Sequence, residues 1–242
     1  MLNAVSGGAR IRVVAGTGHL AADGCSFHGF IVQRDLLADG DSPTADDLRG
    51  RRVEMDITLP HAYWLSKALE PLGLGFDDLE VVDVPMPALV DAFSNGAFDF
   101  TGLDEPRLTQ LLQSGRAVLW QGTEKIVPDY AQNVIFFGPN LLDERPDVGR
   151  RFMNAYRRAI AQYNQGKTPR NLEILTAALR FSSEELEAMC WVSIDGDARV
   201  RSEGFAGYQD WALEQGLVDR VLSEDELVDR RFIDPAVAQS PR

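Results

Sequence analysis

Residues 47–113, DLRGRRVEMDITLPHAYWLSKALEPLGLGFDDLEVVDVPMPALVDAFSNGAFDFTGLDEPRLTQLLQ, decide the fold because strand-like and helix-like stretches alternate along them. The predicted order is a turn and strand over 47–57, a helix over 60–73, a strand over 79–85, a helix over 87–97, a strand over 98–103 and a helix over 104–115. Strands that alternate with helices in this way are typical of a parallel sheet. The stretch therefore predicts an α/β fold.

The ends of these strands are the place to look for a ligand. Open parallel sheets bind small molecules beyond the carboxyl ends of their strands, where loops converge and helix N-termini present free N–H groups. In this chain the loops at that edge are Asp56–His61, Pro85–Pro87 and Thr101–Glu105. We expect a ligand cleft there.

The composition is that of a folded protein. The 242 residues are 45% hydrophobic and 25% charged, close to the usual globular values, and the length suits one large or two small domains. The sequence has no apolar run near the roughly 20 residues of a membrane span. The net charge of −13 argues against nucleic acid as a partner, because neutralising phosphates needs clustered Lys and Arg.

Cysteines and histidines give no metal-binding pattern. Cys25 and Cys190 lie far apart in the sequence and form no CxxC motif, so one disulfide between them stays open at this point. The histidines His19, His28 and His61 lack HExxH-like spacing. The sequence therefore predicts neither a metal site nor a cofactor.

Four more strands are predicted outside the central segment, at Arg10–Gly16, Phe27–Leu36, Ala117–Gly122 and Gln132–Pro139. The polar, turn-rich run Leu37–Asp47 suits a passage from one lobe to another. The first residues, MLNAVSGGARIRVVAG, lack the charged start, apolar run and cleavage site of an export signal. As written, the chain is expected to remain in the cytoplasm.

Beyond Pro139 the pattern becomes helical. An apolar stripe at three- and four-residue spacing is predicted for the first long helix, on Val148, Phe152, Ala155, Ala159 and Tyr163. Further helices are predicted for NLEILTAALRF and for SSEELEAMCW, which Ser182 or Ser183 caps. The C-terminal segment, residues 204–238, predicts a helix that ends at Gly216 and a short helix capped by Ser223.

Several segments together resemble one family. DLRGRRVEMD is similar to the family's "DLKGKKVAV" entry to its second lobe, and AYWLSKALEPLGL to the helix that follows. FSNGAFDFTGLDEPRLTQLLQSG resembles its "L..G.VDA...EP" pattern, and YQDWALEQGLVDRVLSEDELVDRRFIDPAV its closing helices. By their order and spacing, the chain resembles the solute-binding proteins of ABC importers of the nitrate/sulfonate/taurine type, which are related to the binders of thiamine-pyrimidine precursors.

The resemblance implies a two-lobed, periplasmic-binding-protein-like (type II) α/β fold with parallel-rich sheets flanked by helices. Lobe 1 would comprise residues 1–37 and 126–242, and lobe 2 residues 38–125, with Phe27–Leu36 and Gln132–Pro139 as crossovers. Members of the family begin with an export signal and two βα units, and this chain starts after them. Lobe 1 is therefore expected to be incomplete by roughly 60 residues, at about 30 per βαβ unit.

The first candidate binding residues are Thr58, Leu59, Pro60 and His61, between a strand and a helix. Free N–H groups of the first helical turn would hold an anionic or carbonyl oxygen there. His61 is read either as a ligand donor or as an exposed or capping histidine. Pro60 needs no functional account, since its missing N–H costs nothing at that position.

Asp104 and Glu105 are the second candidate pair, and Glu105-Pro106 matches the family's Glu-Pro. Either one carboxylate faces the cleft and accepts from an amine or ring N–H, or Asp104 caps the helix and Glu105 supports its dipole. Gly16 and Thr17 would lie on the lobe 1 side of the cleft. The aromatic residues near these loops are read mostly as core.

The function implied is capture of a small organic solute between the lobes, without bond chemistry, and its delivery to an ABC permease outside the cytoplasm. Two carboxylates beside few hydroxyls tilt the ligand from a sulfonate toward a planar, nitrogen-bearing compound such as a pyrimidine; an aromatic acid also stays open. The alternatives are an enzyme on the same fold, similar to thiamine-pyrimidine synthases or menaquinone-pathway enzymes, and a truncated remnant that binds nothing.

Overall fold

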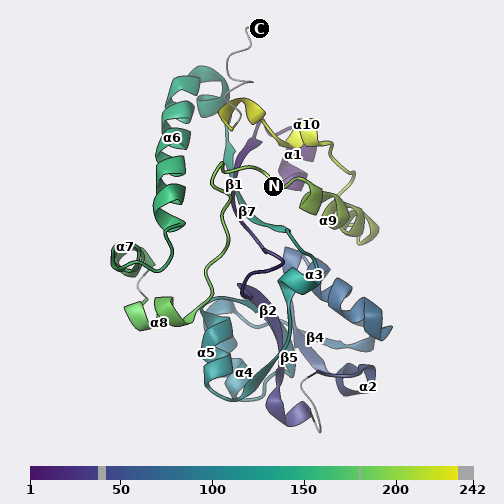
Figure 1. Ribbon diagram of the computed structural model, residues 1–242. Helices are drawn as coiled ribbons and strands as arrows, with labels where there is room; N and C mark the ends of the chain where they lie inside the picture. Colours follow the sequence, from purple (N-terminus) through teal and green to yellow (C-terminus); the bar gives the residue numbers. More distant parts are fainter. Residues whose placement is uncertain (38–41, 180, 234–242) are drawn as a thin grey trace. The chain divides into compact units, whose positions relative to one another are not determined.

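The computed structural model describes residues 1–37, 42–179 and 181–233 (Figure 1). The chain divides into two compact units, which are described separately. Unit 1 comprises Met1–His19, Asp129–Arg180 and Val192–Arg242, and unit 2 comprises Leu20–Pro128 and Phe181–Trp191. Unit 2 includes residues 20–37, 126–128 and 181–191, which the expected boundaries place in lobe 1; the division into lobes stays a prediction. The expected passage at Leu37–Asp47 falls partly on residues 38–41, outside the described residues.

Unit 2 contains the predicted alternation of strands and helices. Its strands are β2 (His28–Gln33), β3 (Arg52–Glu54), β4 (Glu80–Val82), β5 (Phe100–Asp104) and β6 (Ala117–Gly122). Its helices are α2 (Ala45–Leu48), α3 (Pro60–Leu69), α4 (Leu89–Ser94), α5 (Arg107–Gln113) and α8 (Ser183–Ala188). Each lies within a segment that the hydrophobic pattern predicts, with two exceptions. β5 extends one residue past the predicted strand, to Asp104, and α2 was read as part of a turn. A capping box on Thr44 and Asp47 begins α2.

The sheet of unit 2 has the order β4-β3-β5-β2-β6. The pairs β3–β4 and β3–β5 are parallel, whereas β2 is antiparallel to both β5 and β6. The sheet is therefore mixed rather than parallel-rich. Phe27–Leu36 contains β2, which is hydrogen-bonded on both edges inside this sheet; its role as a crossover stays a prediction.

Helices cover both faces of the sheet, with α4 and α5 on one face and α3 on the other (Figure 1). Successive residues of a strand point to opposite faces, so Phe30 and Ile31 of β2 are both almost fully buried. Ile31 belongs to the core beneath α4 and α5, with Leu89, Phe93, Phe98, Leu103, Leu108, Leu111 and Ala117. On the α3 side, Trp64 is 1% exposed.

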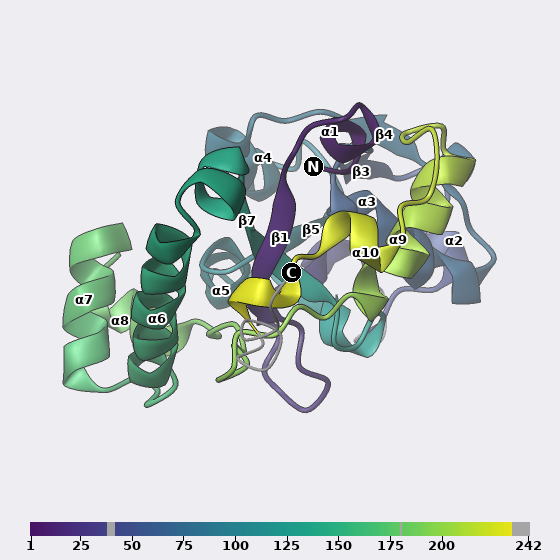
Figure 2. The same cartoon turned by 90° about the horizontal axis from the view of Figure 1, so that it is seen from above.

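Unit 1 is built on a two-stranded antiparallel ribbon of β1 (Arg12–His19) and β7 (Ala131–Phe137). Its helices are α1 (Leu2–Ser6), α6 (Pro146–Tyr163), α7 (Pro169–Leu179), α9 (Glu203–Glu214) and α10 (Glu224–Leu227). Helix α6 lies on one side of the ribbon, and α1, α9 and α10 lie on the other (Figures 1 and 2).

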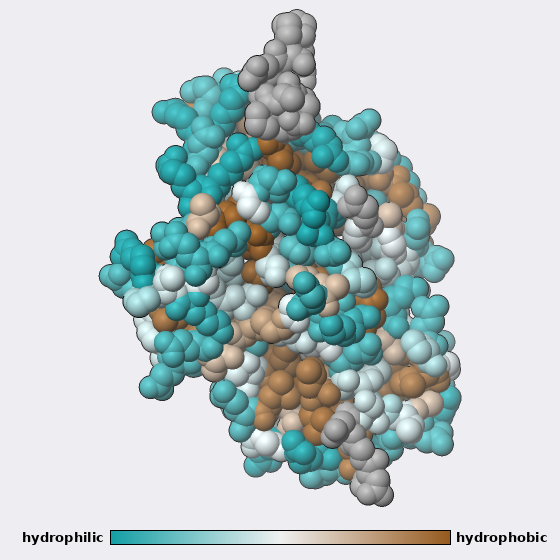
Figure 3. Space-filling model, viewed as in Figure 1, coloured by the Kyte–Doolittle hydropathy of each residue, from teal (hydrophilic) through white to brown (hydrophobic). Residues whose placement is uncertain are grey.

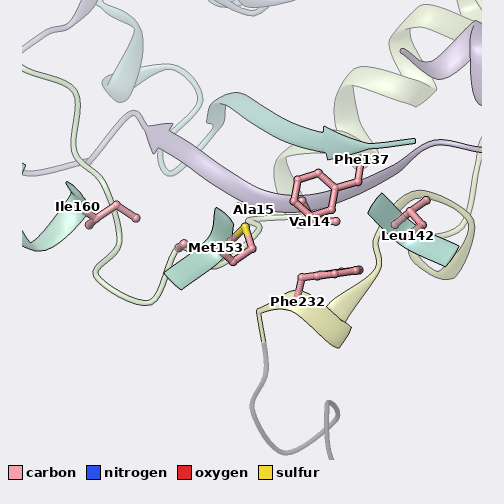
Figure 4. Close-up of a cluster of buried hydrophobic side chains, with 8 residues drawn as sticks. Val14, Ala15, Phe137, Leu142, Met153, Ile160 and Phe232 are labelled. Carbon is pink, nitrogen blue, oxygen red and sulfur yellow. The ribbon is translucent and has the colours of Figure 1, made fainter. Parts of the chain in front are cut away.

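Adjacent residues of β1 supply the cores on the two sides of the ribbon. Val14 packs with Phe137, Met153, Ile160 and Phe232 on the α6 side (Figure 4). Val13 belongs to the other cluster, with Val5, Val200, Leu222, Leu227 and Val228. The predicted stripe on α6 is wrong by about one position: Phe152 is 46% exposed, while the buried residues are Gly149, Met153 and Ile160. The helix approaches the core most closely at Gly149, where a Cβ would lie 2.7 Å from Phe232 Cε1 and 3.0 Å from Phe137 Cε2, so the buried stripe includes this glycine rather than Val148.

A disulfide joins Cys25 to Cys190 within unit 2, across 165 residues of sequence. It ties the segment Phe181–Trp191 to the body of the unit. Hydrophilic residues cover most of the face shown in Figure 3, and hydrophobic residues gather in separate patches between them. Among the described residues, no helix combines the length and apolar character needed to cross a membrane.

Candidate functional site

A pocket of about 240 Å³ lies at the carboxyl ends of β3, β4 and β5 in unit 2. All three predicted loops contribute to its lining, because the carboxyl ends of parallel strands meet at one edge of a sheet. Its apolar lining consists of Phe30, Met55, Leu59, Leu65, Val84, Pro85, Met86, Leu89 and Leu103. The volume lies below the roughly 300–1,000 Å³ of drug-sized sites, so the pocket suits a small molecule.

The polar lining of this pocket is mostly acidic. Its carboxylates are those of Glu54, Asp56, Asp83 and Asp104, and its basic side chains are Arg107 and His61. Among its polar side chains, the pocket therefore has more hydrogen-bond acceptors than donors. Carboxylates accept hydrogen bonds but donate none when ionised.

Two of these carboxyl groups have pKa values that their surroundings shift in opposite directions. Burial raises the pKa of Glu54, whose Oε2 accepts a hydrogen bond of 2.8 Å from the Thr101 hydroxyl. Asp56 has a lowered pKa because the hydroxyl and the N–H of Thr58 both donate to its Oδ1. Asp56, in the loop before α3, is thus held ionised, whereas Glu54 is the more easily protonated group.

Two histidines and an aspartate meet beside the pocket. His61 Nε2 lies 3.6 Å from Asp104 Oδ2, and the rings of His28 and His61 stack with centroids 4.8 Å apart. Trp64 packs against both rings, with centroids 4.7 Å from His28 and 5.0 Å from His61. Burial, and then the nearby His61, lower the pKa of His28 to about 3. His28 is therefore neutral at neutral pH.

The four residues of the first candidate group, Thr58 to His61, have different positions and contacts in the structure. Leu59 and His61 line the pocket. Thr58 turns its hydroxyl to Asp56, at 2.7 Å, and so supports the loop. Pro60 begins α3 at the position where proline is tolerated best. Direct ligand contact by these residues stays a prediction.

The two residues of the second candidate pair, Asp104 and Glu105, also differ in their contacts. Asp104 lines the pocket. The Glu105 carboxylate is 9% exposed as a residue and accepts from the Thr109 N–H at 3.0 Å, the Thr109 hydroxyl at 2.7 Å and the Cys190 N–H at 2.9 Å. Glu105 therefore anchors the start of α5 to the segment beside the disulfide. This contact pattern favours the supporting role over ligand contact.

Gly16 and Thr17 lie in unit 1, on β1. Gly16 accepts a hydrogen bond from the Tyr156 hydroxyl and donates to the Ala198 carbonyl. A Cβ at Gly16 would lie 2.5 Å from the carbonyl oxygen of Arg199, so close backbone packing explains this glycine. A role of Gly16 or Thr17 in binding stays a prediction.

Sequence reasoning did not select His28, Glu54, Asp83 or Arg107. Glu54 ends β3, Asp83 directly follows β4, and Arg107 opens α5 after β5. The strand-end rule therefore would have found them. For His28, no local signal existed, because it lies at the start of β2 and reaches the pocket region only through antiparallel pairing with β5.

Unit 1 has a larger hollow of about 590 Å³ between its N-terminal residues and the α10 region. Three of its four arginines are engaged by acidic neighbours: Arg10 pairs with Asp143, Arg230 with Glu224 and Arg231 with Asp229. The fourth, Arg12, donates to the Ile11 carbonyl. We therefore take the strand-end pocket of unit 2 as the candidate site.

The family follows from comparison of the sequence with family models. A model described as "NMT1/THI5 like" matches residues 32–165, over half of the chain, and the chain belongs to this family. No curated protein matches the sequence significantly. The family match agrees with the resemblance predicted from the sequence.

Solved structures with the same fold include components of import systems and an enzyme. The ligand-binding component of an ABC-type import system from Staphylococcus aureus, with zinc bound, has a TM-score of 0.75 at 15% identity, over 97% of this chain and 77% of that one. The alkanesulfonate-binding protein SsuA from Xanthomonas axonopodis pv. citri, bound to MOPS, has 0.69 at 16%, over 93% and 76%. The desulfurization enzyme DSZB has 0.68 at 18%, over 96% and 80%. These structures confirm the predicted α/β fold of periplasmic-binding-protein type.

Proposed function

We propose that the pocket of unit 2 binds a small organic solute that carries a protonated amine or a nitrogen heterocycle with N–H donors. The observation that carries this proposal is that four carboxylates line the pocket together with apolar side chains, against only two basic groups, Arg107 and His61. A cation or an N–H donor gains charge-assisted hydrogen bonds from carboxylates. A sulfonate in the same place would meet like charge. The apolar lining contacts the hydrocarbon part of the solute.

The protein then acts as the solute-capturing component of an ABC importer and passes its ligand to a permease outside the cytoplasm. Likeness in fold to the Staphylococcus aureus import component and to SsuA supports this role. The Cys25–Cys190 disulfide supports an extracytoplasmic location, because disulfides persist mainly in oxidising compartments.

An enzyme is the second candidate, favoured by the likeness to DSZB and by the two histidines beside the pocket. Both cysteines of the chain are engaged in the disulfide, so thiol chemistry is unfavourable in the oxidised protein. Mass spectrometry of a bound compound after prolonged incubation separates the two roles. A binding protein returns the compound unchanged, whereas an enzyme converts it.

A thermal-shift screen of the purified chain tests the ligand class, since a ligand that binds only the folded state raises the melting temperature. The panel contains benzylamines, aminopyrimidines, alkanesulfonates, taurine and benzoates, with EDTA present throughout. We expect saturable shifts from the amines and aminopyrimidines and none from the simple sulfonates. A shift from sulfonates alone would overturn the proposed ligand class, and no shift from any class would overturn solute binding.

A further inference from the structure

Three groups that bind transition metals converge next to the pocket. They come from three separate elements: His28 from the start of β2, His61 from the first turn of α3 and Asp104 from the end of β5. One ligand atom from each lies within 4.8 Å of the other two. The pair His61 Nε2 and Asp104 Oδ2 is already 3.6 Å apart, close to the roughly 3.3 Å between two ligands of a tetrahedral ion bound at about 2.0–2.1 Å.

The buried histidine is oriented for this role. His28 is 0% exposed, and its Nδ1 is hydrogen-bonded to the Thr123 hydroxyl. Its other ring nitrogen, Nε2, is buried and has no hydrogen-bond partner in the part of the chain that the structure describes. A buried polar atom without a partner is unfavourable, and a metal ion would supply the missing partner. Ligating histidines commonly use their second nitrogen in this way, to fix the ring.

The surroundings hold the His28 ring in place. A Cβ at Gly102 would lie 2.8 Å from His28 Cε1 and 2.9 Å from Nε2, so the ring packs directly on the backbone of β5. The Trp64 ring lies against the ring of His28 from α3.

We propose that His28, His61 and Asp104 form a binding site for one divalent transition-metal ion of the zinc class. Nε2 of His28, Nε2 of His61 and a carboxylate oxygen of Asp104 supply three ligands. Two nitrogens and one oxygen suit Zn²⁺, Co²⁺ or Fe²⁺, whereas Mg²⁺ and Ca²⁺ prefer oxygen ligands alone. Because His61 and Asp104 also line the pocket, the remaining coordination position opens toward it.

Metal titration of the full chain tests this site without any solute. The protein is dialysed against a chelator and titrated with Co²⁺, followed by visible absorption, and with Zn²⁺, followed by calorimetry. We expect one saturable ion per chain, the ligand-field absorption of a low-symmetry Co²⁺ site, and no response to Mg²⁺. Absence of stoichiometric binding would overturn the proposal.

Substitutions locate the ion. We expect His61→Gln and Asp104→Asn to weaken Zn²⁺ binding by at least tenfold, and His28→Gln to do so if circular dichroism shows it folded. His61 and Asp104 are partly exposed, so their variants keep the test valid whatever the fate of His28→Gln. His19→Gln is the matched control, since His19 is the third histidine of the chain and lies in unit 1.

The control also identifies adventitious binding. Undiminished binding in both His61→Gln and Asp104→Asn, or binding lost in His19→Gln, would overturn the proposal. The site does not depend on the proposed solute, because the metal is titrated alone and the solute screen contains EDTA. Metal binding without a solute shift would therefore overturn only the proposed function, and the reverse result only the metal site.

Discussion

His28 and Asp104 are paired directly across β2 and β5, at the first position of the antiparallel register. This pairing brings a buried imidazole from the N-terminal part of unit 2 to the strand end that carries Asp104. The relationship depends on the direction of β2, because a parallel β2 would present its other end to Asp104. The same register places Gly102 opposite Phe30.

Gly102→Ala is expected to destabilise unit 2. The new Cβ would lie 2.7 Å from Phe30 Cε1 and 2.8 Å from His28 Cε1, and overpacking of this kind costs about 1–3 kcal/mol. Urea unfolding followed by circular dichroism measures the loss. Gly75→Ala is the control, because a Cβ at Gly75 meets nothing within 4 Å and its φ of −127° suits alanine. Equal stability of the two variants would contradict the packing argument.

Asp104→Ala and His61→Ala are expected to weaken binding of the solute found in the screen by about ten- to a hundredfold, the loss of one charged hydrogen bond at about 1.5–3 kcal/mol. Calorimetric titration in EDTA measures the affinity. Glu70→Gln serves as control, since Glu70 is exposed and pairs with Lys67. Unchanged affinity in both pocket variants would contradict the assignment of Asp104 and His61 to the solute site.

Glu54→Gln is expected to stabilise the protein at pH 7 and to weaken binding of a cationic solute. The folded-state pKa of Glu54 is raised above 4.5 by burial, so ionisation as the pH rises through that range costs the folded state stability. Glutamine is neutral at every pH and keeps an acceptor for Thr101. Melting temperatures from pH 4 to pH 8 should show an advantage for the variant that vanishes at pH 4. A less stable variant at pH 7 would contradict it.

Glu105→Ala is expected to lower stability by about 1–3 kcal/mol or more, because the Cys190 and Thr109 N–H groups lose their acceptor. Glu105→Gln should recover part of the loss, since its amide oxygen still accepts. Denaturant unfolding measures both, and solute affinity in the folded variants is expected to stay near the wild-type value. A large loss of affinity in Glu105→Gln at unchanged stability would contradict the supporting role and favour direct contact of Glu105 with the ligand.

Much of unit 2 was predictable because its signals are local. Apolar runs of strand length alternate with helical periodicity over residues 47–113, and turn residues separate them. Rules about strand ends then indicated the loops that line the pocket, including Leu59, His61 and Asp104. Side-chain direction was less accessible: Thr58 and Glu105 sit in the right loops, yet their polar atoms are used within the protein.

The sequence by itself determined the α/β class, the order of strands and helices, and the acidic edge of the sheet, because these depend on periodicity and composition along the chain. The tertiary structure alone decided that β2 enters the sheet antiparallel between β5 and β6, and that Cys25 meets Cys190. It also brought together His28 and His61, which no motif spacing links. Strand direction and long-range contacts are set by the packing of the whole core, so a local pattern does not contain them.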